Sequence, residues 1–308
     1  MQETVYALAA SPDYAVDRCC FAGCASGLYR STDGGQSWSY AYDSLQLQAP
    51  LTTVSVALSP AFASDRTLFA GVQGGILRSF DAGQTWDIAW LPAPPPLVTS
   101  LAVSPDFAND GVILAGTMED GAFRSGNQGQ TWSKWNFGLL DLGILALAIS
   151  PGFAQDDTLF LGVETGLYRS ANGGRAWRET GFPIDLAPVI SLALSPHFPA
   201  DGTLFAGAET HGLFQSTDRG QTWRPIAPDL PPGPINAIIL DPTATPDLHL
   251  LIMVGSRLFL SRDAGQSWQP WKPTYQPKST LTTLAAPLGL APTAPLLIGT
   301  LEAGVEII

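Results

Sequence analysis

The sequence predicts an all-β protein, a seven-bladed β-propeller in which blades 1–6 have four strands and blade 7 has three. Three observations predict this fold. An eight-residue box recurs six times, an apolar run that ends in proline recurs seven times, and no window of convincing length has helical periodicity. Four short strands in about 46 residues, repeated along a chain, are typical of propeller blades.

The box first appears as STDGGQSW at 31–38 and returns at 79–86, 125–132, 170–177, 216–223 and 261–268. Its serines lie 48, 46, 45, 46 and 45 residues apart. The recurrent prolines are Pro12, Pro60, Pro105, Pro151, Pro196, Pro242 and Pro287. Each is followed by a glycine that closes the next apolar run: Gly23, Gly71, Gly116, Gly162, Gly207, Gly255 and Gly299. We expect one domain over 1–308, with blades at about 1–45, 46–92, 93–138, 139–183, 184–229, 230–274 and 275–308.

Residues 98–135 illustrate the four strands of one blade, which we name A to D. Residues 98–103 alternate in polarity, 104–111 form a turn-rich loop, and 112–116 are nearly all apolar. Residues 122–125 make a third run, the box follows, and 132–135 make the fourth. We expect a closed ring, since a linear stack would need polar caps at its ends.

The seventh repeat, 281–308, lacks a box and a fourth strand. Two explanations remain open: blade 7 packs on blade 1 by side chains, or the chain is truncated.

Each box position has a mechanical role in the turn between strands C and D. Asp accepts hydrogen bonds from nearby amides, Gly permits a positive φ, Ser caps backbone groups, and Trp buries a large ring. Two boxes carry Asn instead of Asp, a change that metal binding or acid–base chemistry would not survive. We therefore predict a structural role for Asp33, Asp81, Asn127, Asn172, Asp218 and Asp263, and for Trp38, Trp86, Trp132, Trp177, Trp223 and Trp268.

With these boxes the whole chain resembles the BNR or Asp-box repeat β-propellers. That family includes sialidases, xyloglucan-degrading glycoside hydrolases, sortilin-type receptors and photosystem II stability/assembly factors, so the resemblance implies a fold more than a function. One regular box per blade is most similar to the assembly-factor and sortilin-like group.

Composition excludes several classes of function. Lys and Arg number 15 against 27 Asp and Glu, a net charge of −12 that disfavours nucleic acid and anionic membranes as partners. The sequence has no uninterrupted apolar stretch of about 18 residues, the length that a helix needs to span a bilayer. Its first residues lack the basic and apolar regions of a signal peptide. We therefore expect a cytoplasmic protein by default. The alternative is export or display at the cell surface, which applies if the given sequence omits a leader.

The cysteines and histidines do not predict a metal site. Cys19, Cys20 and Cys24 lie in strand B of blade 1, whereas the histidines lie in distant repeats. We expect the cysteines to be buried apolar residues, and we expect neither metal nor cofactor.

The candidate binding residues lie at the blade ends that carry the B–C turns and D–A links, which we call the top ends. Carboxylates beside aromatic rings suit sugars or basic peptides. Alternatively, the carboxylates only solvate the rim and the tryptophans are outer packing. The candidates are Glu119, Asp120, Glu164, Glu209, His211, Glu302, Trp90, Trp135 and Trp271.

Arginines recur just before four boxes, as Arg30, Arg78, Arg124 and Arg169. They could form an anion-binding row, but we expect their stems to pack between blades and their heads to pair with carboxylates. Of the other arginines, Arg178 and Arg224 are expected to head toward the top ends, too few for the arginine triad of a sialidase.

The preferred function is a non-catalytic binding or assembly propeller that engages a protein or peptide, basic in character, through its top ends. A carbohydrate-binding or glycoside-hydrolase-like propeller is the first alternative, because a ring of glutamates can supply paired carboxylates. A structural surface module is the second.

Overall fold

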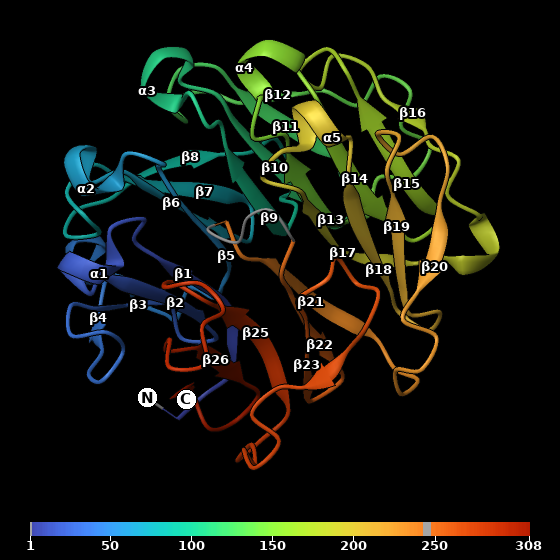
Figure 1. Cartoon of the computed structure of the whole chain (residues 1–308). Coiled ribbons are helices and arrows are strands. Elements are labelled where there is room, and N and C mark those ends of the chain that lie inside the picture. Colours follow the sequence, from blue (N-terminus) through green and yellow to red (C-terminus); the bar gives the residue numbers. More distant parts are fainter. Residues whose placement is uncertain (1, 243–247) are drawn as a thin grey trace. The chain divides into compact units, whose positions relative to one another are not determined.

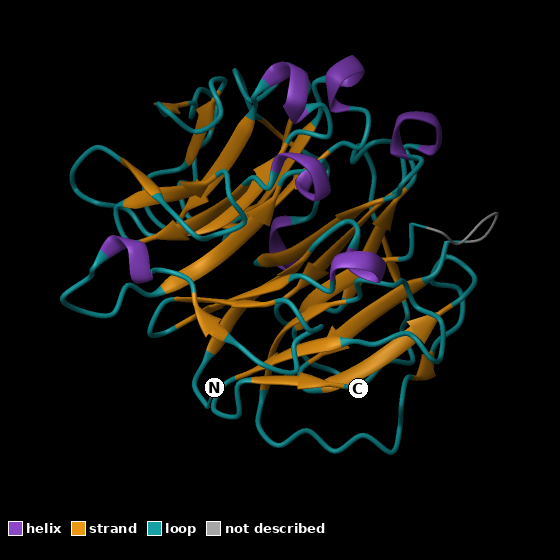
Figure 2. Cartoon of the chain, turned by 90° about the vertical axis from the view of Figure 1, so that its left-hand side faces the viewer, coloured by secondary structure: helices purple, strands orange, loops and turns teal. Residues whose placement is uncertain are grey.

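The computed structural model describes residues 2–242 and 248–308, and strands dominate it (Figure 2). It is a seven-bladed β-propeller, as predicted, with six four-stranded sheets and one three-stranded sheet. The chain divides into two compact units, one of Met1–Lys134, Pro277–Leu288 and Thr293–Ile308 and the other of Trp135–Gln276 and Gly289–Pro292. The expectation of a single domain stays a prediction.

The first unit contains blades 1, 2, 3 and 7 (Figure 1). Their strands are β1 (Val5–Ala10), β2 (Cys20–Cys24), β3 (Leu28–Ser31) and β4 (Ser39–Tyr40); β5 (Thr53–Leu58), β6 (Leu68–Val72), β7 (Gly75–Ser79) and β8 (Asp87–Trp90); β9 (Val98–Val103), β10 (Ile113–Thr117), β11 (Ala122–Ser125) and β12 (Ser133–Lys134); and β25 (Leu281–Ala285), β26 (Leu297–Thr300) and β27 (Val305–Ile307).

The second unit contains blades 4, 5 and 6. Their strands are β13 (Ile144–Ile149), β14 (Leu159–Val163), β15 (Gly166–Ser170) and β16 (Arg178–Glu179); β17 (Val189–Leu194), β18 (Leu204–Ala208), β19 (Leu213–Ser216) and β20 (Arg224–Ile226); and β21 (Ile235–Leu240), β22 (Leu250–Val254), β23 (Arg257–Ser261) and β24 (Gln269–Pro270).

Every sheet is an antiparallel meander in chain order. Strand B is buried along its whole length in blades 1–6, whereas the short strand D is largely exposed. Each A–B pair also has a register shift near the start of strand A, such as that between Val5 and Ala7. This recurrent bulge is a feature that the alternation of apolar residues does not reveal.

A glycine in strand B lets neighbouring blades approach closely. A Cβ added to Gly23 would lie 2.7 Å from the carbonyl oxygen of Thr53 in the next blade, and one added to Gly162 would lie 2.5 Å from that of Val189. Both distances are shorter than a Cβ atom can approach a carbonyl oxygen, so only glycine fits at these two positions without a shift of the neighbouring blade. Gly255 also closes its apolar run, but it lies in the turn after β22 at φ +56°, and Met253 occupies the place opposite Ala237 that a glycine has in the other blades.

The A–B loops of blades 1–5, expected from the sequence as turn-rich, contain single-turn helices (Figure 1). Each begins with a buried aromatic residue, and Phe62 of α2 packs edge-on against Phe21 of the preceding blade at 5.8 Å. A serine before the helix donates to the aspartate that ends it, as Ser59 does to Asp65 at 2.6 Å. The helices are α1 (Tyr14–Asp17), α2 (Phe62–Asp65), α3 (Phe107–Asp110), α4 (Phe153–Asp156) and α5 (Phe198–Asp201).

Blade 7 packs on blade 1 within the first unit. The Thr282 hydroxyl donates to the carbonyl oxygen of Val5 at 2.5 Å, and the Thr4 hydroxyl donates to that of Leu301 at 2.6 Å. Trp38 of the first box packs in one apolar cluster with Val305. Side chains therefore supply much of the contact between these two blades.

No helix in the described part of the chain is long and apolar enough to cross a membrane.

Candidate functional site

The Asp-boxes form closed hydrogen-bond rings at the C–D corners. In the first box, Ser31 Oγ donates to Asp33 Oδ1 at 2.8 Å and accepts from the amide of Gly35 at 2.8 Å. The amide and the hydroxyl of Ser37 then donate to the two Asp33 oxygens at 2.9 and 2.5 Å. Both carboxylate oxygens are thus occupied inside the box.

These bonds favour the ionised carboxylates. Hydrogen bonds from the side chain and amide of Ser37 lower the pKa of Asp33 to about 2, and the same bonds from Ser267 lower the pKa of Asp263 to about 2. A carboxylate with such a low pKa is a poor general acid or base near neutral pH. The geometry therefore gives these groups a turn-forming role rather than a chemical one.

The two asparagine boxes keep the same turn. Asn127 Oδ1 accepts a hydrogen bond from the Thr131 amide at 3.0 Å, and Asn127 Nδ2 donates one to the Thr131 hydroxyl at 2.9 Å. In the aspartate boxes the hydroxyl at this position is instead the donor, as in the bond from Thr85 to Asp81. Asn172 Oδ1 accepts from the amide of Ala176 at 2.9 Å, where no hydroxyl follows.

Two of the box tryptophans link their corner to the preceding D–A link. Trp86 Nε1 donates to the carbonyl oxygen of Ala41 at 2.8 Å, and Trp177 Nε1 donates to that of Trp135 at 2.7 Å. Ala41 and Trp135 both precede the next blade's strand A, so these bonds tie a box to the link that enters its blade. Both rings are buried, as a packing role requires.

The box and the A–B loop share one end of each blade. The amide of Ala82 donates to the carbonyl oxygen of Arg66 at 2.9 Å, and the amide of Gly173 donates to that of Asp157 at 2.9 Å. The B–C turns therefore lie at the opposite ends of the same strands, where the candidate binding residues were expected.

The four candidate glutamates are exposed residues of B–C turns. Glu119 and Glu302 lie in the first unit, and Glu164 and Glu209 lie in the second. None has an ion pair among the described residues. Asp120 differs, since it is half-buried and pairs with Lys134 Nζ at 2.6 Å.

His211 lies beside a pocket in the second unit. Its Nδ1 is 2.9 Å from the Thr210 hydroxyl. The pocket has a volume of about 380 Å³, and its other wall is the proline-rich D–A link around Pro228 and Pro231. Residue types did not predict this pocket, because its wall depends on the path of the link.

The three candidate tryptophans are in different environments. The ring of Trp90 is open to solvent, with 69% of the residue exposed. Trp135 is half-buried with the guanidinium of Arg175 over its ring at 5.6 Å. Trp271 is buried at 8% exposure, beneath Lys272 Nζ at 5.0 Å, so its ring is covered by the chain itself.

The arginines before the boxes face different residues across the C–D strand pairs. Arg78 pairs with Asp87 at 3.4 Å and also reaches the carbonyl oxygen of Gln128 at 3.5 Å. This matches the expected pairing with a neighbouring carboxylate. Arg30 and Arg124 stand opposite Ser39 and Ser133 instead.

The cysteines are free and buried in or beside β2. Burial raises the pKa of Cys20 and of Cys24 to about 12, which leaves both thiols protonated and unreactive near neutral pH. Among the residues that the structure describes, no three His, Cys, Asp or Glu side chains gather where they could hold a metal ion.

Comparison with known proteins agrees with the repeat. The model of the BNR/Asp-box repeat matches residues 29–40, which include the first box. No curated protein matches the chain in sequence. The chain is thus a β-propeller whose first box matches the BNR/Asp-box repeat.

Solved structures share the fold at low sequence identity. The GH74 xyloglucanase from Xanthomonas campestris has a TM-score of 0.73 and 21% identity, over 99% of this chain and 52% of that one. The GH74 enzyme of Niastella koreensis has a TM-score of 0.76 and 17% identity, over 99% and 52%. YCF48 bound to D1 peptide has a TM-score of 0.72 and 16% identity, over 100% and 94%. The chain therefore spans about half the length of the two GH74 enzymes.

Proposed function

We propose that the chain is a non-catalytic binding propeller that engages a basic protein or peptide through carboxylates at its top ends. The observation that carries this proposal is the difference between two sets of acidic residues. The box carboxylates accept hydrogen bonds within their own corners, whereas Glu119, Glu164, Glu209 and Glu302 are exposed and form no ion pair with any residue that the structure describes.

Free carboxylates at chain turns can bind lysine and arginine side chains by charge-assisted hydrogen bonds. Their negative charge also speeds the encounter with a cationic partner at low salt. The extent of the likeness to YCF48 supports a peptide partner, because the match spans 94% of a chain whose structure contains a bound peptide.

The experiment compares two variants with the same net charge. In the first, Glu119, Glu164, Glu209 and Glu302 are replaced by glutamine, and in the matched control Asp33, Asp81, Asp218 and Asp263 are replaced by asparagine. Each variant loses four negative charges, and asparagine already occurs at two box positions. Binding of fluorescent lysine- and arginine-rich peptides is measured by anisotropy at several salt concentrations.

The glutamate variant should bind at least about tenfold more weakly and with a shallower salt dependence, while the box variant keeps its affinity. Equal weakening of both variants would mean that only net charge matters. Unchanged binding in the glutamate variant would refute the proposed site.

A glycan ligand is the second candidate, and the exposed ring of Trp90 favours it. A flat aromatic ring open to solvent can stack on a sugar face. Binding on a glycan array that is lost in Trp90→Ala would support this candidate, and a reducing-sugar assay would distinguish a hydrolase from a binder.

A further inference from the structure

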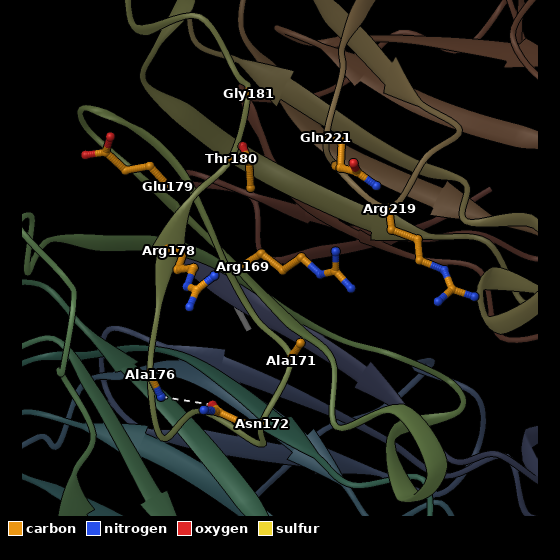
Figure 3. A pocket seen from close by; sticks show the side chains of 11 residues that line it. Arg169, Ala171, Asn172, Ala176, Arg178, Glu179, Thr180, Gly181, Arg219 and Gln221 are labelled. Carbon is orange, nitrogen blue, oxygen red and sulfur yellow. Dashed lines mark hydrogen bonds between the residues drawn. The ribbon is translucent and has the colours of Figure 1, made fainter.

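A second pocket, in blades 4 and 5 of the second unit, is lined by three arginines. It has a volume of about 600 Å³, and Arg169, Arg178 and Arg219 contribute to its wall. In Figure 3 the side chain of Arg169 extends toward Arg219, Arg178 lies beside it, and the carboxylate of Glu179 points the other way. Arg178 thus lies beside the box and not toward the top end, which corrects the expectation from the sequence.

Two of these arginines face each other across a strand pair. Arg169 of β15 is the register partner of Arg178 of β16. Like charges directly opposite in an antiparallel pair are destabilising. The equivalent pairs in the other described C–D hairpins avoid this arrangement: Arg30–Ser39, Arg78–Asp87, Arg124–Ser133, Gln215–Arg224 and Leu260–Gln269.

No carboxylate of the described residues forms an ion pair with an arginine of this cluster. Among the residues that the structure describes, the ion pairs are those of Arg78 with Asp87 and of Lys134 with Asp120. Glu179 accepts a hydrogen bond from the Tyr168 hydroxyl at 3.1 Å instead. Burial, with the nearby charge of Arg219, lowers the pKa of Arg169, and the charge of Asp156 only partly offsets this.

Several donors of the pocket remain unused. Arg169 Nε is buried and has no hydrogen-bond partner, whereas Arg219 donates through Nη2 to the carbonyl oxygen of Pro199 at 2.7 Å. The box of blade 4 also has an uncharged Asn172 where four other boxes have Asp, so it adds no negative charge. Ala176 offers no hydroxyl, which leaves Asn172 Nδ2 without the partner that Asn127 has.

We propose that this pocket binds a tetrahedral oxyanion, the phosphate or sulfate group of a small molecule. Guanidinium groups bind such anions in a bidentate manner through a planar fork of donors. The bound anion offsets the repulsion between Arg169 and Arg178, and the remaining volume accommodates a body such as a sugar ring. This site is independent of the acidic top ends.

Isothermal titration calorimetry at low ionic strength tests the site. The probes are inorganic phosphate, inorganic sulfate, glucose 6-phosphate, glucose 6-sulfate and acetate. Phosphate and sulfate should bind the wild-type protein more tightly than acetate, and the tighter of the two sugar esters identifies the source of the anion.

The key variant is Arg178→Ser, which copies the residue of blades 1 and 3. It should weaken binding roughly ten- to a hundredfold, which corresponds to the loss of one charge-assisted interaction. Arg224→Ser is the matched control, since this arginine occupies the same strand position but bonds to Gln215 Oε1 at 2.6 Å. Arg219→Ala gives a second variant that leaves the strand pair intact.

Absence of binding of every probe to the wild-type protein overturns the proposal. So does equal binding by Arg178→Ser and wild type, or an equal loss in Arg224→Ser. In each case circular dichroism confirms that the variant is folded.

Discussion

The C–D corners of blades 2 and 4 share one framework and differ in what lines it. Both have a serine that caps the turn, a box residue that accepts from an amide four positions on, and a buried tryptophan tied to the preceding link. In blade 2, however, Arg78 faces Asp87, whereas in blade 4 Arg169 faces Arg178. The shared parts form the turn, and the differing parts set the charge of the surface beside it.

The largest loss of stability is expected from removal of the buried tryptophan that both corners share. Trp86→Ala and Trp177→Ala should each lower the free energy of unfolding by about 3–5 kcal/mol, because each removes a buried ring and its bond to the preceding link. Urea denaturation measures this loss. The exposed Trp90→Ala is the control, with a change within about 0.5 kcal/mol. A large loss in one blade alone would show that the two corners are not equivalent.

Removal of the capping serine should have the next largest effect. Ser79→Ala and Ser170→Ala each leave the buried amide of a box glycine without its acceptor, at a cost of about 1–3 kcal/mol. The same denaturation assay applies, with the exposed Ser64→Ala as the control. Losses below about 0.5 kcal/mol in both variants would contradict the capping role.

The fold was predictable because its signals recur. The period places six boxes and seven A–B pairs, and the strands predicted over 98–135 agree with β9–β12 to within one or two residues. The single-turn helices escaped prediction since four residues are too few for helical periodicity. Their aromatic and aspartate residues recur at a fixed distance after Pro60 and Pro105, a signal that could have revealed them.

The candidate sites were less predictable because they depend on register and packing. Trp90 and Trp271 look alike in sequence, yet one is exposed and the other is covered. The pairing of Arg169 with Arg178 follows only from the C–D register. Blade 4 nevertheless carries a readable signal, an arginine on each side of its box, which blades 1–3 lack.

Acid pH should distinguish the aspartate box of blade 2 from the asparagine box of blade 4. Burial tends to raise the pKa of Asp81, but hydrogen bonds from Thr85, Ser79 and Gln84 outweigh it and leave the pKa lowered. The stability that these bonds provide is therefore complete above the unfolded value of 3.8 and is lost as pH falls through the lower folded value.

Thermal unfolding between neutral pH and about pH 2 measures this dependence. Asp81→Asn should flatten the fall in melting temperature, whereas Asn172→Asp should steepen it because it adds a carboxylate among arginines. Parallel curves for wild type and Asp81→Asn would contradict the contribution of Asp81.

The smallest change in stability is expected when the charges opposite Arg169 and Arg78 are exchanged between the two corners. Arg178→Asp gives blade 4 the pairing of blade 2 and should raise stability by about 0.2–1 kcal/mol, while Asp87→Arg gives blade 2 the like pairing and should lower it by a similar amount. Denaturation at low and high salt measures both, and the differences should shrink as salt screens the charges. Loss of stability in Arg178→Asp would mean that Arg178 has a structural role. A gain in stability, together with loss of phosphate binding, would mean that blade 4 keeps a repulsive pair because an anion occupies its corner.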